Sequence, residues 1–118
     1  MKDTKKILIV DDNETFRNIL AEGLRKRQCV VEVAFSIEMA KAMLKEKNFS
    51  VICVDVQLPD ENGFELFDYI RANKENQAII VMSSSLSPRD NLQARLRKAF
   101  CVSKCEENLL DIIKNYEN

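Results

Sequence analysis

Residues 51–55 read Val-Ile-Cys-Val-Asp, an unbroken apolar run that stops on the carboxylate of Asp55. A continuous apolar run of this length is typical of a strand that is covered on both faces of its sheet. A second run, Ile-Leu-Ile-Val at residues 7–10, stops on the pair Asp11 and Asp12. Because neighbouring parallel strands end at the same edge of a sheet, the two runs predict three acidic side chains in one crevice.

Apolar runs alternate with helical patterns along the whole chain. Further runs fall near residues 30–35, 79–82 and 100–102, and Ser36 and Ser87 are suited to cap the helices that follow them. Five such units predict an α/β fold with a five-stranded parallel sheet of order 2-1-3-4-5, doubly wound, in a single domain over residues 1–118. The expected helical stripes are Phe16, Ile19, Leu20 and Leu24; Ala40, Met43 and Leu44; Leu66, Phe67 and Ile70; Leu92 and Leu96; and Leu109, Ile112, Ile113 and Tyr116.

The composition excludes several classes of function. Of 118 residues, 46% are hydrophobic and 31% charged, as in an ordinary soluble protein, and the net charge of −1 gives no general attraction to nucleic acid or to anionic membranes. No apolar stretch is long enough for a membrane span and the charged N-terminus is not a secretion signal, so we expect a cytoplasmic protein with reduced cysteines. The chain contains no His, which excludes a His triad, His metal ligands and a phosphorylated His of its own.

Two further strand ends carry polar side chains that belong to the same crevice. The fourth apolar run is followed by Ser83, beside Asp55 in the predicted order, and the fifth by Lys104, roughly 10 Å away and within reach of a long side chain. Two carboxylates about 5 Å apart repel by about 3 kcal/mol at an effective dielectric constant of 20. Three together call for a cation, and all-oxygen ligation with open positions suits Mg²⁺.

Four short motifs lie at these strand ends: Ile-Val-Asp-Asp at residues 9–12, Val-Asp-Val-Gln-Leu-Pro-Asp-Glu-Asn-Gly at 54–63, Ile-Val-Met-Ser-Ser at 80–84 and Val-Ser-Lys at 102–104. Together they resemble the receiver domain of bacterial two-component response regulators, over essentially the whole chain. The resemblance implies the flavodoxin-like, CheY-like fold and a signalling phospho-acceptor. Such a protein is not an enzyme in the usual sense, although it assists its own phosphoryl transfer and slow autodephosphorylation.

The resemblance also implies a role for each matched residue. Asp55 would accept the phosphoryl group, Lys104 would contact it, and the hydroxyl of Ser83 would act as the switch. The implied Mg²⁺ ligands are Asp11, Asp12, Asp55 and the backbone carbonyl of Gln57.

The implied partners follow from the absence of His. A sensor histidine kinase or a histidine phosphotransfer protein would supply the phosphoryl group, and an output partner, not identified by the sequence, would bind the face made by the fourth helix, the fifth strand and the fifth helix. That face could also form a homodimer, but neither nucleic acid nor a membrane is an expected partner of this domain. Its basic residues are Arg89, Arg95, Arg97 and Lys98.

Three departures from the family pattern leave alternatives open. Cys105 stands where Pro usually follows the lysine, and Cys101 stands at the usual switch aromatic, with Phe100 one position off. The small Gly that usually precedes the fifth strand is missing, since the segment at residues 97–99 reads Arg-Lys-Ala with about one residue deleted. A pseudo-receiver that only binds proteins is therefore the alternative function. An enzyme of the haloacid dehalogenase type is less favoured, because that class needs a second acid where Gln57 stands. Whether the domain stands alone or belongs to a longer protein is left open.

Overall fold

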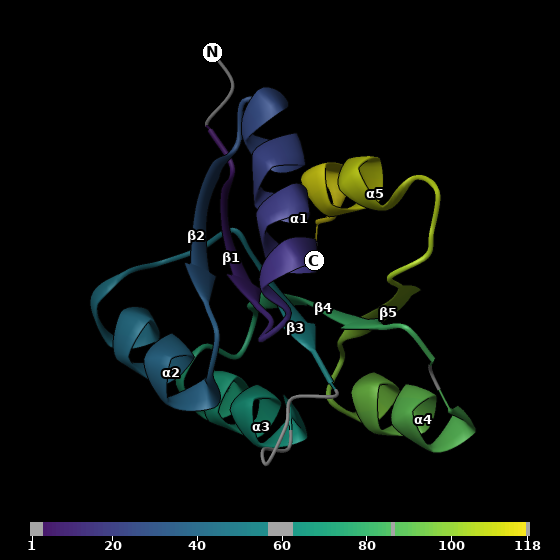
Figure 1. Ribbon diagram of the computed structural model, residues 1–118. Coiled ribbons are helices and arrows are strands. Elements are labelled where there is room, and N and C mark those ends of the chain that lie inside the picture. The colour runs from purple at the N-terminus through teal and green to yellow at the C-terminus, as the bar shows by residue number, and fades with distance from the viewer. Residues whose placement is uncertain (1–3, 57–62, 86, 118) are drawn as a thin grey trace.

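The computed structural model describes residues 4–56, 63–85 and 87–117. In these residues five strands alternate with five helices (Figure 1). The strands are β1 (Lys6–Val10), β2 (Val30–Ala34), β3 (Val51–Asp55), β4 (Ala78–Ser83) and β5 (Phe100–Ser103). The helices are α1 (Glu14–Lys26), α2 (Ile37–Glu46), α3 (Gly63–Asn73), α4 (Pro88–Leu96) and α5 (Leu109–Asn115). The predicted alternation of strands and helices is confirmed, and each strand lies within two residues of its predicted position.

The sheet has the predicted topology. All neighbouring strands pair in parallel, and their order is β2-β1-β3-β4-β5. Val10 pairs with Val54, so β1 and β3 end together, and the direction of winding reverses between them. Doubly wound sheets form their sites at such a reversal, outside the carboxyl ends of the strands.

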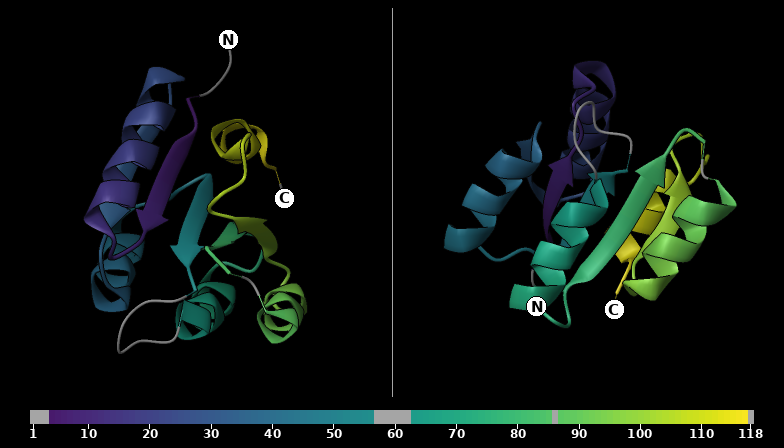
Figure 2. Two further views of the ribbon diagram at one scale, coloured as in Figure 1. Left: turned by 45° about the vertical axis from the view of Figure 1, so that its right-hand side comes forward. Right: turned by 90° about the horizontal axis from the view of Figure 1, so that it is seen from below.

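Helices cover both faces of the sheet. In Figures 1 and 2, α1 and α5 lie on one face, and α2, α3 and α4 lie on the other. Successive residues of β1 alternate between the two cores, with Ile7 packed on the α1 side and Leu8 on the α2 side. Gly23 allows the close approach of α5 to α1, because a Cβ there would lie 2.7 Å from a methyl carbon of Leu110.

Three helices begin on a side-chain cap. Ser36 Oγ accepts the N–H of Met39 at 3.1 Å, and Ser87 Oγ accepts the N–H of Asp90 at 3.0 Å, as the sequence predicts. Asn13 caps α1 in the same way, which the sequence analysis did not anticipate. These bonds satisfy amide groups that have no acceptor within the helix.

Two of the predicted apolar stripes are partly wrong. Ile19 is 64% exposed, because the buried side of α1 is centred on Leu20. Leu92 and Leu96 of α4 are 54% and 68% exposed, and the buried residue of that helix is Ala94. The helix α4 therefore presents its large apolar side chains to solvent and is attached to the rest of the protein by other contacts.

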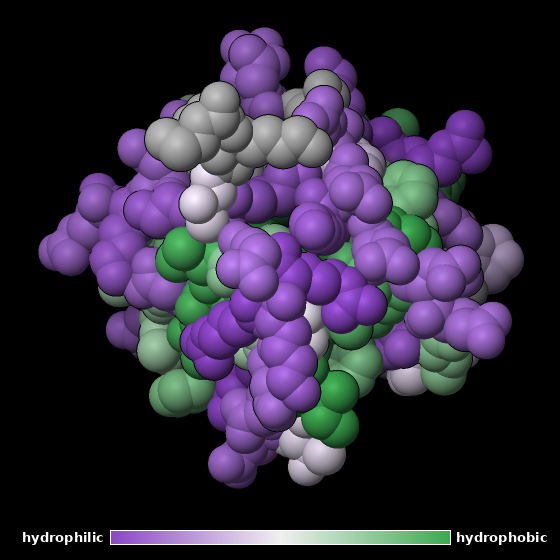
Figure 3. Space-filling model, turned by 90° about the horizontal axis from the view of Figure 1, so that it is seen from above, coloured by the Kyte–Doolittle hydropathy of each residue, from purple (hydrophilic) through white to green (hydrophobic). Residues whose placement is uncertain are grey.

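The end of the molecule at which β1 begins is mainly polar. Hydrophilic side chains dominate the face drawn in Figure 3, and hydrophobic ones show only in small groups between them. Within the described parts of the chain, none of the helices has both the length and the apolar character that a membrane crossing requires.

Candidate functional site

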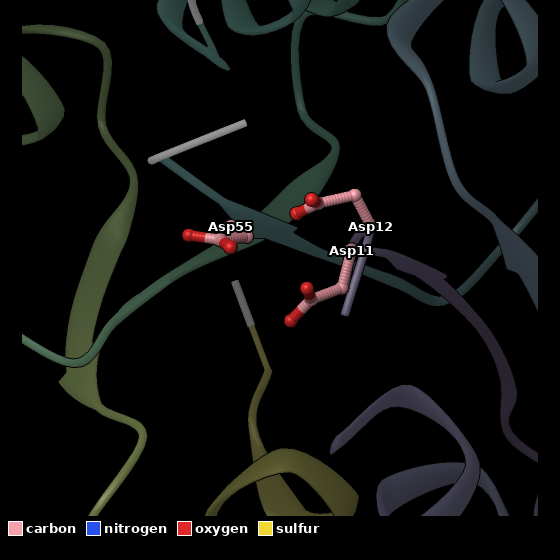
Figure 4. A group of neighbouring side chains, drawn as sticks. All are labelled: Asp11, Asp12 and Asp55. Atoms are coloured by element: carbon pink, nitrogen blue, oxygen red, sulfur yellow. The ribbon is translucent and has the colours of Figure 1, made fainter. Parts of the chain in front are cut away.

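The three predicted carboxylates come together at the carboxyl ends of β1 and β3 (Figure 4). Asp11, Asp12 and Asp55 each offer an oxygen, and the three oxygens lie within 4.8 Å of one another. Asp11 and Asp55 are buried, whereas Asp12 is exposed. The cluster thus has two walls inside the protein and one edge at the solvent.

Lys104 reaches this cluster from the end of β5. Its ammonium nitrogen donates a hydrogen bond to Asp55 Oδ2 at 3.0 Å and lies 2.7 Å from Asp11 Oδ2. The contact with Asp11 is a close ion pair without hydrogen-bond geometry, so Asp11 Oδ2 is a buried oxygen that lacks a hydrogen-bond donor. The lysine thus places one positive charge between two buried carboxylates, as the strand order predicts.

Burial and charge shift the pKa of two of these groups. Burial raises the pKa of Asp11, and the neighbouring Lys104 only partly offsets this. For Lys104, burial alone would lower the pKa, but the contacts with Asp11 and Asp55 outweigh it and raise the pKa overall. At neutral pH the lysine is therefore charged, while the ionised form of Asp11 is held at a cost in folding free energy.

The cluster fits a divalent cation. Its donors are carboxylate oxygens, which suit Mg²⁺ and Ca²⁺, and Asp11 Oδ2 is a buried oxygen that accepts no hydrogen bond from any residue the structure describes. A cation between the three carboxylates would relieve their mutual repulsion. The predicted fourth ligand, the carbonyl of Gln57, lies outside the described residues.

Ser83 is buried at the end of β4, next to Asp55 in the sheet. Its Oγ accepts the N–H of Ser85 at 3.1 Å, and its carbonyl accepts the N–H of Lys104 at 2.9 Å. Ser83 therefore links the loop that leads to α4 with the strand that carries the lysine. The structure brings this predicted site residue to the cluster.

Cys105 and Cys101, the two cysteines at which the sequence departs from the pattern it resembles, have ordinary backbone geometry. The peptide bond after Lys104 is trans, as are the others in the described ranges, and the lysine still reaches both carboxylates. Cys101 is half-buried and packs against the core on the α4 side. Phe100 instead stacks on Tyr116, the residue that follows α5, with ring centroids 5.2 Å apart. The aromatic ring thus lies on the α5 side of β5 and does not replace the missing one at Cys101.

Sequence reasoning missed one neighbour of the cluster. Phe16, in the first turn of α1, places its ring centroid 4.5 Å from the ammonium nitrogen of Lys104. The sequence assigns this residue to an apolar stripe, and its ring is indeed partly packed on the core. The contact of the ring with the lysine could not be predicted from the spacing of apolar residues.

The comparison with protein families agrees with this geometry. The family model described as the response regulator receiver domain matches residues 7–114. A curated relative, the photosynthetic apparatus regulatory protein RegA of Cereibacter sphaeroides, is 32% identical over 79 residues, which are 67% of this chain and 43% of that protein. The chain thus matches less than half of the length of this relative.

Two solved structures are similar in fold. One is a response regulator from Burkholderia pseudomallei with a phosphorylated aspartic acid, a calcium ion and citrate; it has a TM-score of 0.86 and 26% identity over 94% of this chain and 66% of that one. The other is the response regulator TrrA from Thermotoga maritima in complex with Mg²⁺ and BeF; it has a TM-score of 0.80 and 25% identity over 92% of this chain and 94% of that one.

Proposed function

Because this chain belongs to the response regulator receiver domain family, we propose that residues 1–118 form one receiver domain in which Asp55 accepts a phosphoryl group. The observation that carries the proposal is the placement of Asp55, a buried carboxylate hydrogen-bonded to Lys104 within a cluster of three acids. The chain contains no histidine, so it does not carry a phosphohistidine of its own. The proposed donor is therefore a phosphohistidine on a sensor histidine kinase or a histidine phosphotransfer protein.

The transfer is a displacement at phosphorus. An oxygen of Asp55 forms a bond to phosphorus while the phosphorus–nitrogen bond of the donor breaks, and the electron pair of that bond stays on the imidazole. Lys104 moves its hydrogen bond from the carboxylate to an oxygen of the arriving phosphoryl group, and the strand ends hold both groups in place. The result is an acyl phosphate on Asp55, so the domain is a signalling acceptor that assists its own modification.

The acidic cluster is proposed to hold Mg²⁺. Asp11, Asp12 and Asp55 would bind the ion, with the backbone carbonyl of Gln57 as a further ligand. The ion supplies positive charge for the transferring oxygens. The structures with Mg²⁺ and with Ca²⁺ support this choice, because they belong to relatives of the same fold.

Output is proposed to run from Ser83 to the face formed by α4, β5 and α5. The hydroxyl of Ser83 can donate its hydrogen to a phosphoryl oxygen on Asp55 while it still accepts the N–H of Ser85, so a movement of Ser83 toward the phosphoryl group would pull the loop before α4. The face exposes Leu92, Leu96 and Phe100, which suits an output partner or a second copy of the chain. Arg97, expected in this basic surface, is instead engaged with Asp68 of α3 at 2.7 Å.

A pseudo-receiver that only binds proteins is the second candidate, and one observation favours it. Cys101 occupies the position of the switch aromatic, and Phe100 lies on the other side of β5 against Tyr116. The coupling of Ser83 to the output face therefore lacks its usual second part. The intact pairing of Lys104 with Asp55 favours the phospho-acceptor.

Phosphoramidate, a small phosphodonor, tests the choice. With Mg²⁺ present, we expect intact-mass measurement to find one phosphoryl group added per chain, and none when EDTA removes the metal, because the acidic cluster then repels the donor. A chain that stays unmodified at every Mg²⁺ concentration contradicts the proposed acceptor and supports the pseudo-receiver.

The variant Asp11→Asn tests the metal site. Since the pKa of Asp11 is raised on folding, its ionised form destabilises the protein above the pKa of the unfolded chain, and the neutral variant should melt at a higher temperature in EDTA. Mg²⁺ at ten times its Kd should stabilise the wild type by about 1.4 kcal/mol, a few degrees in Tm, and the variant much less. Thermal unfolding followed by circular dichroism measures both effects.

The matched control for this variant is Glu46→Gln, which removes one negative charge from an exposed side chain. It should melt like the wild type in EDTA and show the full Mg²⁺ shift. An equal Mg²⁺ shift in Asp11→Asn and in the wild type would remove Asp11 from the ligand set.

A further inference from the structure

Lys104 has a third neighbour besides the two carboxylates. The face of the Phe16 ring lies against its ammonium, at 4.5 Å from the ring centroid, and only 14% of the lysine side chain is exposed. At this distance an aromatic ring attracts a cation, and the attraction strengthens as water is excluded. The ring therefore closes the side of the ammonium that the carboxylates leave open.

The ring is held in place by the acidic cluster itself. Asp11 Oδ1 accepts the N–H of Asn13 at 2.9 Å, and Asn13 Oδ1 accepts the N–H of Phe16 at 2.9 Å. Lys104 in turn contacts both the ring of Phe16 and Asp11 Oδ2, so the two ends of this chain of contacts meet at the carboxylate of Asp11. The N-terminal cap of α1 thus fixes the backbone of Phe16, and its ring packs on the core with one face against the lysine.

Of the three contacts that the ammonium makes with described residues, the one with the ring does not change in the proposed reaction. A cation bound to the acidic cluster competes for the oxygens of Asp11 and Asp55, and a phosphoryl group removes the negative charge of one Asp55 oxygen. The ring has no charge to lose and no ligand to take. It remains available to hold the ammonium over the pocket while the carboxylates change partners.

We propose that Phe16 is a positioning residue for phosphoryl transfer, which holds Lys104 at the site through the face of its ring. This inference rests on the proposed function of Asp55 as acceptor. The backbone of Lys104 is placed by its N–H, which donates to the carbonyl of Ser83 at 2.9 Å, and the contacts of its side chain then place the ammonium.

The test compares Phe16→Leu, which keeps apolar bulk without a ring, with Phe16→Tyr, which keeps the ring. With phosphoramidate and Mg²⁺, Phe16→Leu should be phosphorylated about three- to tenfold more slowly, and Phe16→Tyr at nearly the wild-type rate. In the Lys104→Met background, adding Phe16→Leu should not slow the reaction further, because the ring then has no ammonium to hold. Neither ring variant should bind Mg²⁺ more weakly, because neither removes a ligand.

A spectroscopic readout separates positioning from simple packing. In the wild type and in Phe16→Tyr, the ring current should shift the NMR signals of the Lys104 side-chain protons next to the ammonium, and this shift should vanish in Phe16→Leu. The matched control is Phe35→Leu, which removes an exposed ring that lies over Arg17 at 5.4 Å instead of over the lysine. It should leave both the rate and the Lys104 signals unchanged.

The outcomes distinguish the two levels of the proposal. A wild-type chain that takes up no phosphoryl group overturns the proposed function and this inference together. If the wild type is labelled, equal rates in Phe16→Leu and the wild type overturn the positioning role alone. An equal slowing in Phe16→Tyr and Phe16→Leu also overturns it. So does a slowing by Phe16→Leu that is as large in the Lys104→Met background as in the wild type.

Discussion

Replacing Asp55 by Asn will abolish the uptake of a phosphoryl group from phosphoramidate. The substitution keeps the size of the side chain but replaces the anionic oxygen, which forms the bond to phosphorus, with an amide. Asp55 alone is proposed to form the bond to phosphorus, so Asp11 and Asp12, the other two acids of the cluster, should not take up the group in its place. The expected result is a fall from one group per chain to none.

Intact mass, followed by treatment with hydroxylamine, measures this result. Hydroxylamine cleaves an acyl phosphate and leaves a phosphoserine intact, so it distinguishes Asp55 from the nearby Ser83. Glu46→Gln serves again as the matched control and should be labelled fully, and thermal unfolding checks that Asp55→Asn is folded. Labelling of Asp55→Asn at the wild-type level would show that another residue is the acceptor.

The sheet was predictable because its central strands, β1, β3 and β4, are continuous apolar runs. In a chain of this size such a run predicts a strand that helices cover on both faces. In the structure β1, β3 and β4 are buried along most of their length. Once strands are placed in order, the ends of the strands are placed as well. The convergence of Asp11, Asp55 and Lys104 therefore follows from the sequence and is found in the structure.

The helix faces were less predictable, because a pattern of apolar residues does not say which side the helix turns inward. Leu92 and Leu96 predict a buried stripe on α4, but the buried residue is Ala94. In this orientation Arg97, just after α4, pairs with Asp68 of α3 at 2.7 Å. A contact between side chains of two separate helices leaves no trace in the spacing along either.

The same limit applies to the candidate site. The strand ends could be deduced from the sequence alone, but the ring of Phe16 beneath Lys104 depends on the cap of α1 and on how that helix packs. The basic surface predicted on α4 is wrong for Arg97, since its guanidinium also lies 5.1 Å from the ring centroid of Phe64. Side chains with two uses, such as Arg and Phe, are where pattern reasoning fails.

The attachment of α4 depends on a second arginine, Arg71 of α3. Its guanidinium donates to the carbonyl oxygens of Arg97 at 2.8 Å and Lys98 at 3.0 Å, just after α4, and to those of Gln77 at 2.6 Å and Glu75 at 3.2 Å, just before β4. Burial lowers the pKa of Arg71, so its charge is partly desolvated and its hydrogen bonds are correspondingly strong. One side chain thus joins two loops through four backbone acceptors.

The variant Arg71→Met will destabilise the protein by about 3 kcal/mol, since it keeps the length of the side chain but leaves the two partly buried carbonyls, those of Gln77 and Arg97, without their charged donor. In thermal unfolding this amounts to a fall in Tm of roughly 10 °C. Arg71→Lys should recover only part of the loss, because an ammonium cannot reach both loops at once as the planar fork does. Urea unfolding measures the free energies.

Arg95→Met is the matched control, because Arg95 is an exposed basic residue of α4 itself, and its replacement should change the free energy of unfolding by less than about 0.5 kcal/mol. Hydrogen exchange should locate the effect of Arg71→Met in the amides of α4 and the start of β5, which lose their anchor, with α1 little affected. If Arg71→Met costs no more than Arg95→Met, water satisfies the four carbonyls. The helix α4 is then attached without a strong contribution from Arg71, which leaves it freer to move when the loop after Ser83 shifts.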